Sequence, residues 1–253
     1  KIYNRNLLYH GCIPLNEDGS FKEIEINGSC FHGRALYDIL ESYIRKAFMG
    51  VSEREKTLGR DIMWYIWLNP DSPLFGKDKM ATFERYFIAN KALHKEKKGY
   101  YYTLRDNEKI CDRILEEFGV TGVHTHIING HVPVKTIKGE QPMKAGGKLL
   151  VIDGGFSKAY QPETGIAGYT LVYHSHGLQL VQHEPFQSTQ KAIEEGQDIK
   201  STTFVIEFNS QRMMVKDTDK GKELVTQIQD LKKLLVAYRT CLLYTSPSPR
   251  DRS

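Results

Sequence analysis

The sequence predicts a mixed α/β fold, because two hydrophobic patterns follow one another along its 253 residues. Helical spacing of apolar residues dominates the earlier part of the chain, and continuous or alternating apolar runs dominate the later part. The two patterns show no regular βαβ alternation. A chain of this length can bury a substantial core, so we expect one large domain or two small ones.

The first predicted elements are a strand, a hairpin or loop, and a helix. The run NLLYHG reads as a buried strand whose last residue is His10. The stretch NEDGSFKEIEINGS is rich in turn residues and predicts a polar hairpin or loop. From Gly33 to Gly50 the apolar residues recur with helical spacing, and Gly50 is a natural terminator.

Two more helices are predicted before the strands begin. The run DIMWYIWL (61–68) is apolar almost all round and predicts one or two turns of buried helix, with a strand as the alternative. The run NEKICDRILEEFG (107–119) carries its apolar residues on one face, and Gly119 lies beyond its end.

Strands dominate the rest, and a helix closes the chain. HTHIING (124–130), KLLVIDGG (148–155) and TTFVIEF (202–208) read as strands, and two alternating runs around Ser175-His176-Gly177 predict a hairpin. His174 and His176 form an H-x-H pair at the hairpin tip, which can chelate a metal ion, but we favour exposed side chains without a functional role. The apolar positions of the last helix begin at Leu224, with Thr218 or Asp219 as its N-cap.

Composition excludes several classes of protein. Hydrophobic residues make up 40% and charged residues 26% of the chain, as in ordinary globular proteins, and no apolar run reaches the length of a membrane helix. A net charge of +4 is too small to indicate nucleic-acid binding. The four cysteines form no CxxC pair, which argues against a disulfide framework and predicts a reducing, cytoplasmic location.

The two ends of the chain differ from the rest. The chain begins with Lys1 and not Met, so we expect the natural amino terminus to lie upstream. The ending CLLYTSPSPRDRS has no periodicity and resembles a translated sequencing adapter, with a natural disordered tail as the alternative. We therefore expect one domain over residues 1–239, a non-native tail over 240–253, and a fragment of a longer protein with exposed apolar edges.

His10 and His131 share one local pattern, since each ends an apolar strand and lies beside a glycine. Strand ends hold side chains rigidly, neutral imidazole is a common metal ligand, and glycine permits close approach. Both histidines are therefore candidate metal ligands, and a structural role in a turn is the alternative. The chain has no HExxH motif that would complete a site. For Asp153, at the end of a predicted strand, we favour a turn cap over a ligand-orienting role.

Longer stretches resemble a known family. LLYHGCIPL, and NGHVPVK followed by VIDGG, resemble the last two histidine motifs of calcineurin-like metallophosphoesterases. Together with SPLFGKDKMATFERYFI and HKEKKGYYYTLRDNEKICDRILEEFG, they resemble class III (Firmicutes-type) fructose-1,6-bisphosphatase, over Lys1 to Arg239. The resemblance implies a carboxyl-terminal fragment of a metallophosphoesterase-type sandwich of mixed sheets with outer helices. The sandwich would be incomplete at its amino-terminal side and carry a helical insert over about 31–120.

The same resemblance implies a manganese-dependent phosphatase with two metal ions, which removes the 1-phosphate of fructose 1,6-bisphosphate in gluconeogenesis. Two cations about 3.5–4 Å apart can activate water and hold the attacking and leaving oxygens. Of the family's ligands only His10 and His131 are present, and the catalytic carboxylates would lie upstream. The family's Gly-His-Thr-Pro reads Gly-His-Val-Pro, with Val132 beside the ligand. We expect the fragment alone to be inactive; a homo-oligomer is compatible with the sequence.

A bisphosphate substrate would also require cationic side chains away from the metals. We favour Lys79, Arg85 and Lys158 because their apolar, glycine-rich surroundings indicate formed loops, although a solvated surface charge explains any one of them. HKEKK (94–98) reads as a solvated face. The alternatives for function are another metallophosphoesterase, such as a protein phosphatase or dinucleoside polyphosphatase, and a non-catalytic module that binds a phosphorylated ligand.

Overall fold

The computed structural model describes residues 1–153, 156–196 and 200–240 and shows a mixed α/β protein, as predicted. It divides into two compact units. Among the described residues, unit 1 comprises 1–172 and 179–206, and unit 2 comprises 173–178 and 207–240. The predicted tail, 240–253, lies outside the described residues except for Thr240.

A five-stranded sheet lies at the centre of unit 1, in the order β1-β2-β5-β7-β6. Strands β2, β5 and β7 are parallel, whereas β1 and β6 pair antiparallel at the two edges. Leu7 pairs with Ile127, which pairs with Leu149, and all three are almost fully buried. Their apolar runs suit a sheet covered on both faces. The five strands are β1 (Ile2–Tyr3), β2 (Asn6–Leu8), β5 (His126–Asn129), β6 (Met143–Lys144) and β7 (Leu149–Val151).

Helix α5 (Glu108–Glu117) contacts this sheet at β5. Its predicted apolar face is confirmed, because Ile110, Ile114 and Leu115 are buried in the main core. The side chain of Asn107 caps the helix by accepting from the Lys109 amide at 3.0 Å. Shorter helices of unit 1 are α3 (Thr82–Phe87), α4 (Tyr101–Leu104), α6 (Gln161–Thr164) and α7 (Thr189–Glu194).

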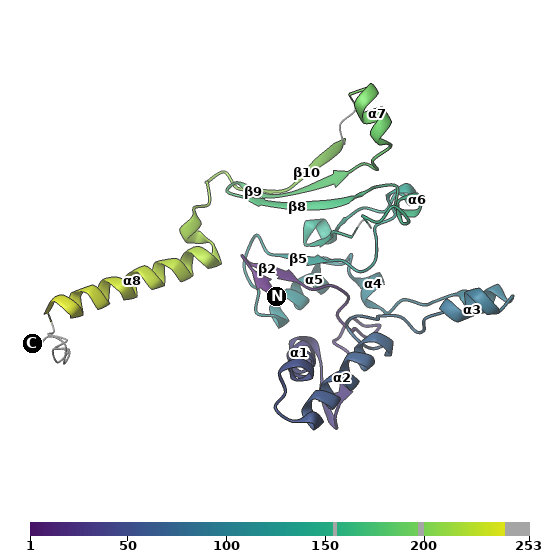
Figure 1. The fold of residues 1–253 in the computed structure, drawn as a ribbon, viewed down its shortest axis with the longest axis horizontal. Helices are drawn as coiled ribbons and strands as arrows, with labels where there is room; N and C mark the ends of the chain where they lie inside the picture. Colours follow the sequence, from purple (N-terminus) through teal and green to yellow (C-terminus); the bar gives the residue numbers. More distant parts are fainter. Residues whose placement is uncertain (154–155, 197–199, 241–253) are drawn as a thin grey trace, which may run out of the picture. The chain divides into compact units, whose positions relative to one another are not determined.

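Helices α1 (Gly33–Met49) and α2 (Glu53–Leu68) pack against each other (Figure 1). The helix predicted from Gly33 is confirmed. The predicted burial of residues 61–68 is wrong, since Trp64 is 64% and Trp67 56% exposed. The run is helical, but only one side of it packs into a cluster, at Ile62.

The turn-rich stretch before α1 forms a hairpin. Strands β3 (Ile24–Ile26) and β4 (Ser29–Phe31) pair antiparallel around Asn27-Gly28. Both turn residues have positive φ, 52° and 81°, which suits an Asn-Gly turn. Ile24 and Ile26 pack with α1 and α2 in a second hydrophobic cluster.

A three-stranded sheet of order β10-β9-β8 contains the second predicted hairpin, which is confirmed. Its strands are β8 (Gly168–His174), β9 (Gly177–His183) and β10 (Ser201–Phe208). Tyr169, Leu180 and Ile206 from these strands join the same core as Ile127 and Leu149. The part of this sheet that belongs to unit 1 therefore shares one core with the five-stranded sheet.

Unit 2 contains η4 (Val215–Asp217) and α8 (Asp219–Thr240). The predicted cap at Thr218 is confirmed, because its hydroxyl accepts from the Gly221 amide at 3.0 Å. His176, predicted to be exposed, is only partly exposed. Its Nδ1 lies 3.1 Å from the Asn209 carbonyl oxygen, and its ring stacks on Phe208.

None of the helices in the described ranges combines the length and the apolar character that crossing a bilayer requires.

Candidate functional site

Three side chains gather where neighbouring parallel strands end. His10 lies two residues after β2, His131 two residues after β5, and Asp153 two residues after β7. The prediction placed His10 at the last position of its strand, but β2 ends at Leu8. Because the carboxyl ends of parallel strands meet at one edge of a sheet, the three residues lie close together.

Backbone hydrogen bonds continue the sheet into this edge. The Gly130 amide donates to the His10 carbonyl at 3.1 Å, and the Val134 amide donates to the Asp153 carbonyl at 2.8 Å. Gly130 lies between the two side chains, since a Cβ built there would lie 3.6 Å from His10 Nδ1 and 3.7 Å from Asp153 Oδ2. These bonds fix the strand ends relative to one another.

The two histidine rings contact each other directly. His131 Nδ1 lies 3.2 Å from His10 Nε2, and the rings are arranged edge to face. His131 has φ of 68°, and the Val132 amide donates to the Gly130 carbonyl across it at 2.8 Å. This γ-turn with positive φ is rare and strained, and such backbone strain clusters at functional sites.

The surroundings of His131 favour its neutral form. Burial lowers the pKa of His131, the charges of His10 and Lys77 lower it further, and Asp153 acts in the opposite direction. A neutral imidazole keeps the lone pair that binds a metal ion down to a lower pH.

A buried hydrogen-bond network supports the edge from behind. Asn129 Nδ2 donates to the Gly11 carbonyl at 3.0 Å and to the Tyr101 hydroxyl at 2.9 Å. The Tyr101 hydroxyl also lies 2.8 Å from that of Tyr9. The network joins the end of β5 to α4 and to the segment that carries His10. It was not predicted, because each of its bonds joins residues far apart in the sequence.

Two imidazoles are only part of a metal-binding set. The described residues contain no group of three or more His, Cys, Asp and Glu side chains arranged to hold a metal ion. His10 and His131 fit the role of ligands by donor type and proximity, but binding through the two facing nitrogens would break the contact between them.

The predicted phosphate-binding residues have no described bond to the histidine pair; their described partners lie elsewhere. Lys79 Nζ donates to the Leu93 carbonyl at 2.9 Å, and Arg85 lies 3.4 Å from Glu96. Lys158 is exposed, and the Gly-Gly turn before it lies outside the described residues. None of the three has a hydrogen bond to either histidine within the described ranges.

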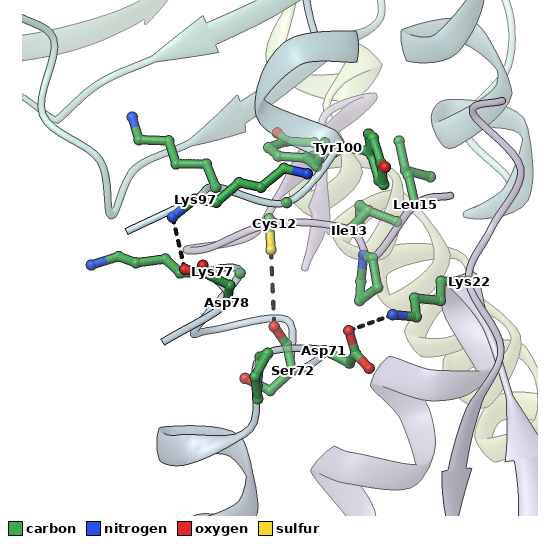
Figure 2. A pocket seen from close by; sticks show the side chains of 16 residues that line it. Cys12, Ile13, Leu15, Lys22, Asp71, Ser72, Lys77, Asp78, Lys97 and Tyr100 are labelled. Atoms are coloured by element: carbon green, nitrogen blue, oxygen red, sulfur yellow. Dashed lines mark hydrogen bonds and ion pairs between the residues drawn. The ribbon is translucent and has the colours of Figure 1, made fainter. Parts of the chain in front are cut away.

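A pocket next to this edge was not predicted. Lys77, Lys97 and Lys98 line it, and we call it the lysine pocket. Figure 2 shows Lys77 and Lys97 on one side, Cys12 at its centre, and Lys22 across from them. Lys22 is paired with Asp71 at 2.6 Å.

The lysine pocket forms through a long-range pairing. Lys77 and Lys98 form an isolated antiparallel bridge, and the Gly99 amide donates to the Gly76 carbonyl at 2.9 Å. This bridge brings Lys97 and Lys98, which the sequence placed on a solvated face, to the pocket wall. A local pattern carries no signal for it.

These features define a mixed α/β protein with a histidine pair at the carboxyl ends of parallel strands and a cationic pocket beside it. A family model described as Firmicute fructose-1,6-bisphosphatase matches residues 1–240. The chain belongs to this family.

Curated relatives carry the name fructose-1,6-bisphosphatase class 3. The chain is 77% identical to the relative from Bacteroides fragilis, 72% to that from Bacteroides thetaiotaomicron and 58% to that from Clostridium tetani. Each match covers 96% of this chain but 37% of the relative, so the chain spans little more than a third of their length. No solved structure matches it.

Proposed function

We propose that this chain is part of an enzyme that hydrolyses the 1-phosphate of fructose 1,6-bisphosphate to give fructose 6-phosphate and phosphate. The observation that supports this most is the His10–His131 pair at the ends of parallel strands, in a chain whose relatives carry the name of that activity. We place the reaction in gluconeogenesis and in the cytoplasm. The location is supported by the cysteines with described positions, Cys12, Cys30 and Cys111, which are all free thiols, as is usual in a reducing compartment.

The proposal includes a manganese site with two ions and a metallophosphoesterase-type sandwich. His10 and His131 would supply imidazole nitrogens, which suit manganese, iron or zinc. The remaining ligands would come from outside the described residues. Bound metal ions supply an activated water and neutralise charge on the phosphoryl group.

We keep Lys79, Arg85 and Lys158 as proposed contacts to substrate phosphate. Arg85 fits this role best. Its ion pair with Glu96 fixes the side chain, which is nevertheless 55% exposed. The guanidinium could therefore present further donors to a phosphate.

The test uses a chimera in which residues 1–239 replace the matching segment of the Bacteroides fragilis relative. We expect the manganese-loaded chimera to release phosphate from fructose 1,6-bisphosphate and the isolated chain to release none. His10→Ala and His131→Ala should each lower kcat/KM more than about 100-fold, beyond the loss typical of a ligand's hydrogen-bond partners. His94→Ala is the matched control, because His94 contacts the Ile88 carbonyl and not the pair.

Three results would contradict the proposal in different ways. Turnover by the isolated chain would show that its own residues suffice. Release from p-nitrophenyl phosphate but not from fructose 1,6-bisphosphate would indicate another phosphoester substrate. A folded chimera that binds no manganese would favour a non-catalytic module that binds a phosphorylated ligand. The chain by itself already fits that alternative better, because its described residues offer two imidazoles and no complete metal-binding group.

A further inference from the structure

Two cations of the lysine pocket, Lys97 and Lys98, have no described carboxylate paired with their ammonium groups, although Asp78 also lines the pocket and accepts from the Lys97 backbone amide at 2.7 Å. Lys98 Nζ lies 5.4 Å from the centre of the Tyr102 ring, and Lys97 Nζ lies 5.7 Å from that of Tyr100. Neither ammonium group forms an ion pair with a described residue, whereas Lys77 is paired with Glu96 at 3.0 Å. Aromatic faces attract a cation but leave its N–H donors available to a ligand.

A buried arginine lies behind Lys98. Arg105 is 3% exposed, and its guanidinium carbon lies 5.3 Å from the centre of the Tyr102 ring that Lys98 also contacts. Within the described residues its Nε and Nη1 have no hydrogen-bond partner, and its carboxylate neighbour, Glu140, lies 3.5 Å from Nη2. A buried cation with incomplete pairing is costly, and a nearby anion would offset that cost.

The charges around Lys98 are mostly positive. Partial desolvation lowers the pKa of Lys98, the charges of Arg105, Lys135 and Lys77 lower it further, and Glu140 acts in the opposite direction. A bound anion would therefore relieve repulsion among these cations.

The lysine pocket adjoins the histidine pair along the chain and through the network behind it. Cys12, which lines the pocket, follows His10 by two residues, a step of at most about 7 Å between Cα atoms. Tyr101 also lines the pocket, and its hydroxyl accepts from Asn129 at the end of β5. A molecule with phosphates at both ends could therefore reach both places.

We propose that the lysine pocket binds the phosphate that the reaction leaves in place, with Lys98 as its main contact and Arg105 as the buried charge behind it. The inference rests on the proposed function for the nature of the ligand, a sugar bisphosphate. It makes Lys98 a specificity residue that distinguishes a bisphosphate from a simple phosphate monoester.

The test compares Lys98→Gln and Lys98→Arg in the manganese-loaded chimera, with Lys95→Gln as the matched control from the same basic run. Dissociation constants for fructose 6-phosphate, which carries the retained phosphate, need no turnover. KM and kcat for fructose 1,6-bisphosphate, and kcat/KM for p-nitrophenyl phosphate, complete the set. Thermal unfolding verifies that each variant folds.

We expect Lys98→Gln to weaken fructose 6-phosphate binding and raise KM for the bisphosphate about tenfold or more, the size of a lost charged hydrogen bond. Its activity on p-nitrophenyl phosphate, which has no second phosphate for Lys98 to hold, should fall far less than its kcat/KM for the bisphosphate. Lys98→Arg should retain part of the binding, and Lys95→Gln all of it.

Several outcomes overturn the assignment: no binding of fructose 6-phosphate by the unsubstituted chimera, a Lys98→Gln variant that binds like Lys95→Gln, or an equal loss on p-nitrophenyl phosphate. If the bisphosphate is hydrolysed while Lys98→Gln behaves like the control, the proposed function stands and the pocket assignment fails. If the bisphosphate is not hydrolysed but Lys98→Gln still weakens fructose 6-phosphate binding, the pocket assignment stands and the proposed function fails.

Discussion

Gly11 lets two segments of backbone approach each other next to His10. A Cβ built at this buried glycine would lie 2.2 Å from the Pro73 carbonyl oxygen, which belongs to backbone and cannot rotate away. We expect Gly11→Ala to lower the free energy of unfolding by about 1–3 kcal/mol, as overpacking does, measured by urea denaturation. Gly99→Ala is the control, because its nearest atom is 3.4 Å away. Equal midpoints for the two variants would contradict the close approach.

The cysteines should differ in reactivity. Burial raises the pKa of Cys12 and of Cys111 to about 12, whereas Cys30 is exposed. A raised pKa keeps the thiol protonated, so at pH 8 only about one buried thiol in 10,000 is the reactive thiolate. We expect iodoacetamide to modify Cys30 and to spare Cys12 and Cys111 until the protein is unfolded, as peptide mapping by mass spectrometry would show. Equal labelling of all three in the folded protein would argue against this packing.

At the scale of elements, the Tyr101 hydroxyl links α4 to the end of β5 by a hydrogen bond. The Tyr101 hydroxyl contacts Asn129 Nδ2 and the Tyr9 hydroxyl, whereas the neighbouring Tyr102 hydroxyl is buried and faces the Cys12 thiol, a weak hydrogen-bond partner. We expect Tyr101→Phe to cost about 1–3 kcal/mol of unfolding free energy, because it leaves a buried donor less well satisfied. Tyr102→Phe should change the free energy by less than about 0.5 kcal/mol. The pair can be compared by urea denaturation, and the reverse order would refute the network.

Local sequence patterns predicted the histidine pair but not the lysine pocket or the exposed face of α2. The pairing of His10 with His131 could be anticipated, because an apolar run and a glycine mark the end of each strand locally. The lysine pocket could not, since it depends on a bridge between Lys77 and Lys98 across the whole of α3. The burial of residues 61–68 was misjudged because hydrophobicity alone does not say which face of a helix another element covers.

For the molecule as a whole, the sequence predicted exposed apolar surface, and the described chain carries much of it. Edge strand β1 exposes Ile2 by 41% and Tyr3 by 45%, and α3 exposes Phe83 and Phe87 by 74% and 80%. Exposed apolar groups of this size contribute little to stability, because burial is the source of hydrophobic free energy. The stability of this chain should therefore be concentrated in the core of unit 1.

Helix α8 offers a direct test of that distribution. Five of its apolar residues recur at intervals of four and three, and each of the five is at least 42% exposed. None of them belongs to a hydrophobic cluster of the described chain. They are Leu224, Ile228, Leu231, Leu235 and Tyr238. We expect deletion of residues 224–240 to shift the free energy of unfolding by less than about 1 kcal/mol and to reduce binding of a hydrophobic dye. Ile127→Ala, at a fully buried position, should cost about 2–5 kcal/mol in the same urea experiment. A loss on deletion as large as that of Ile127→Ala would mean that α8 buries its apolar face in solution.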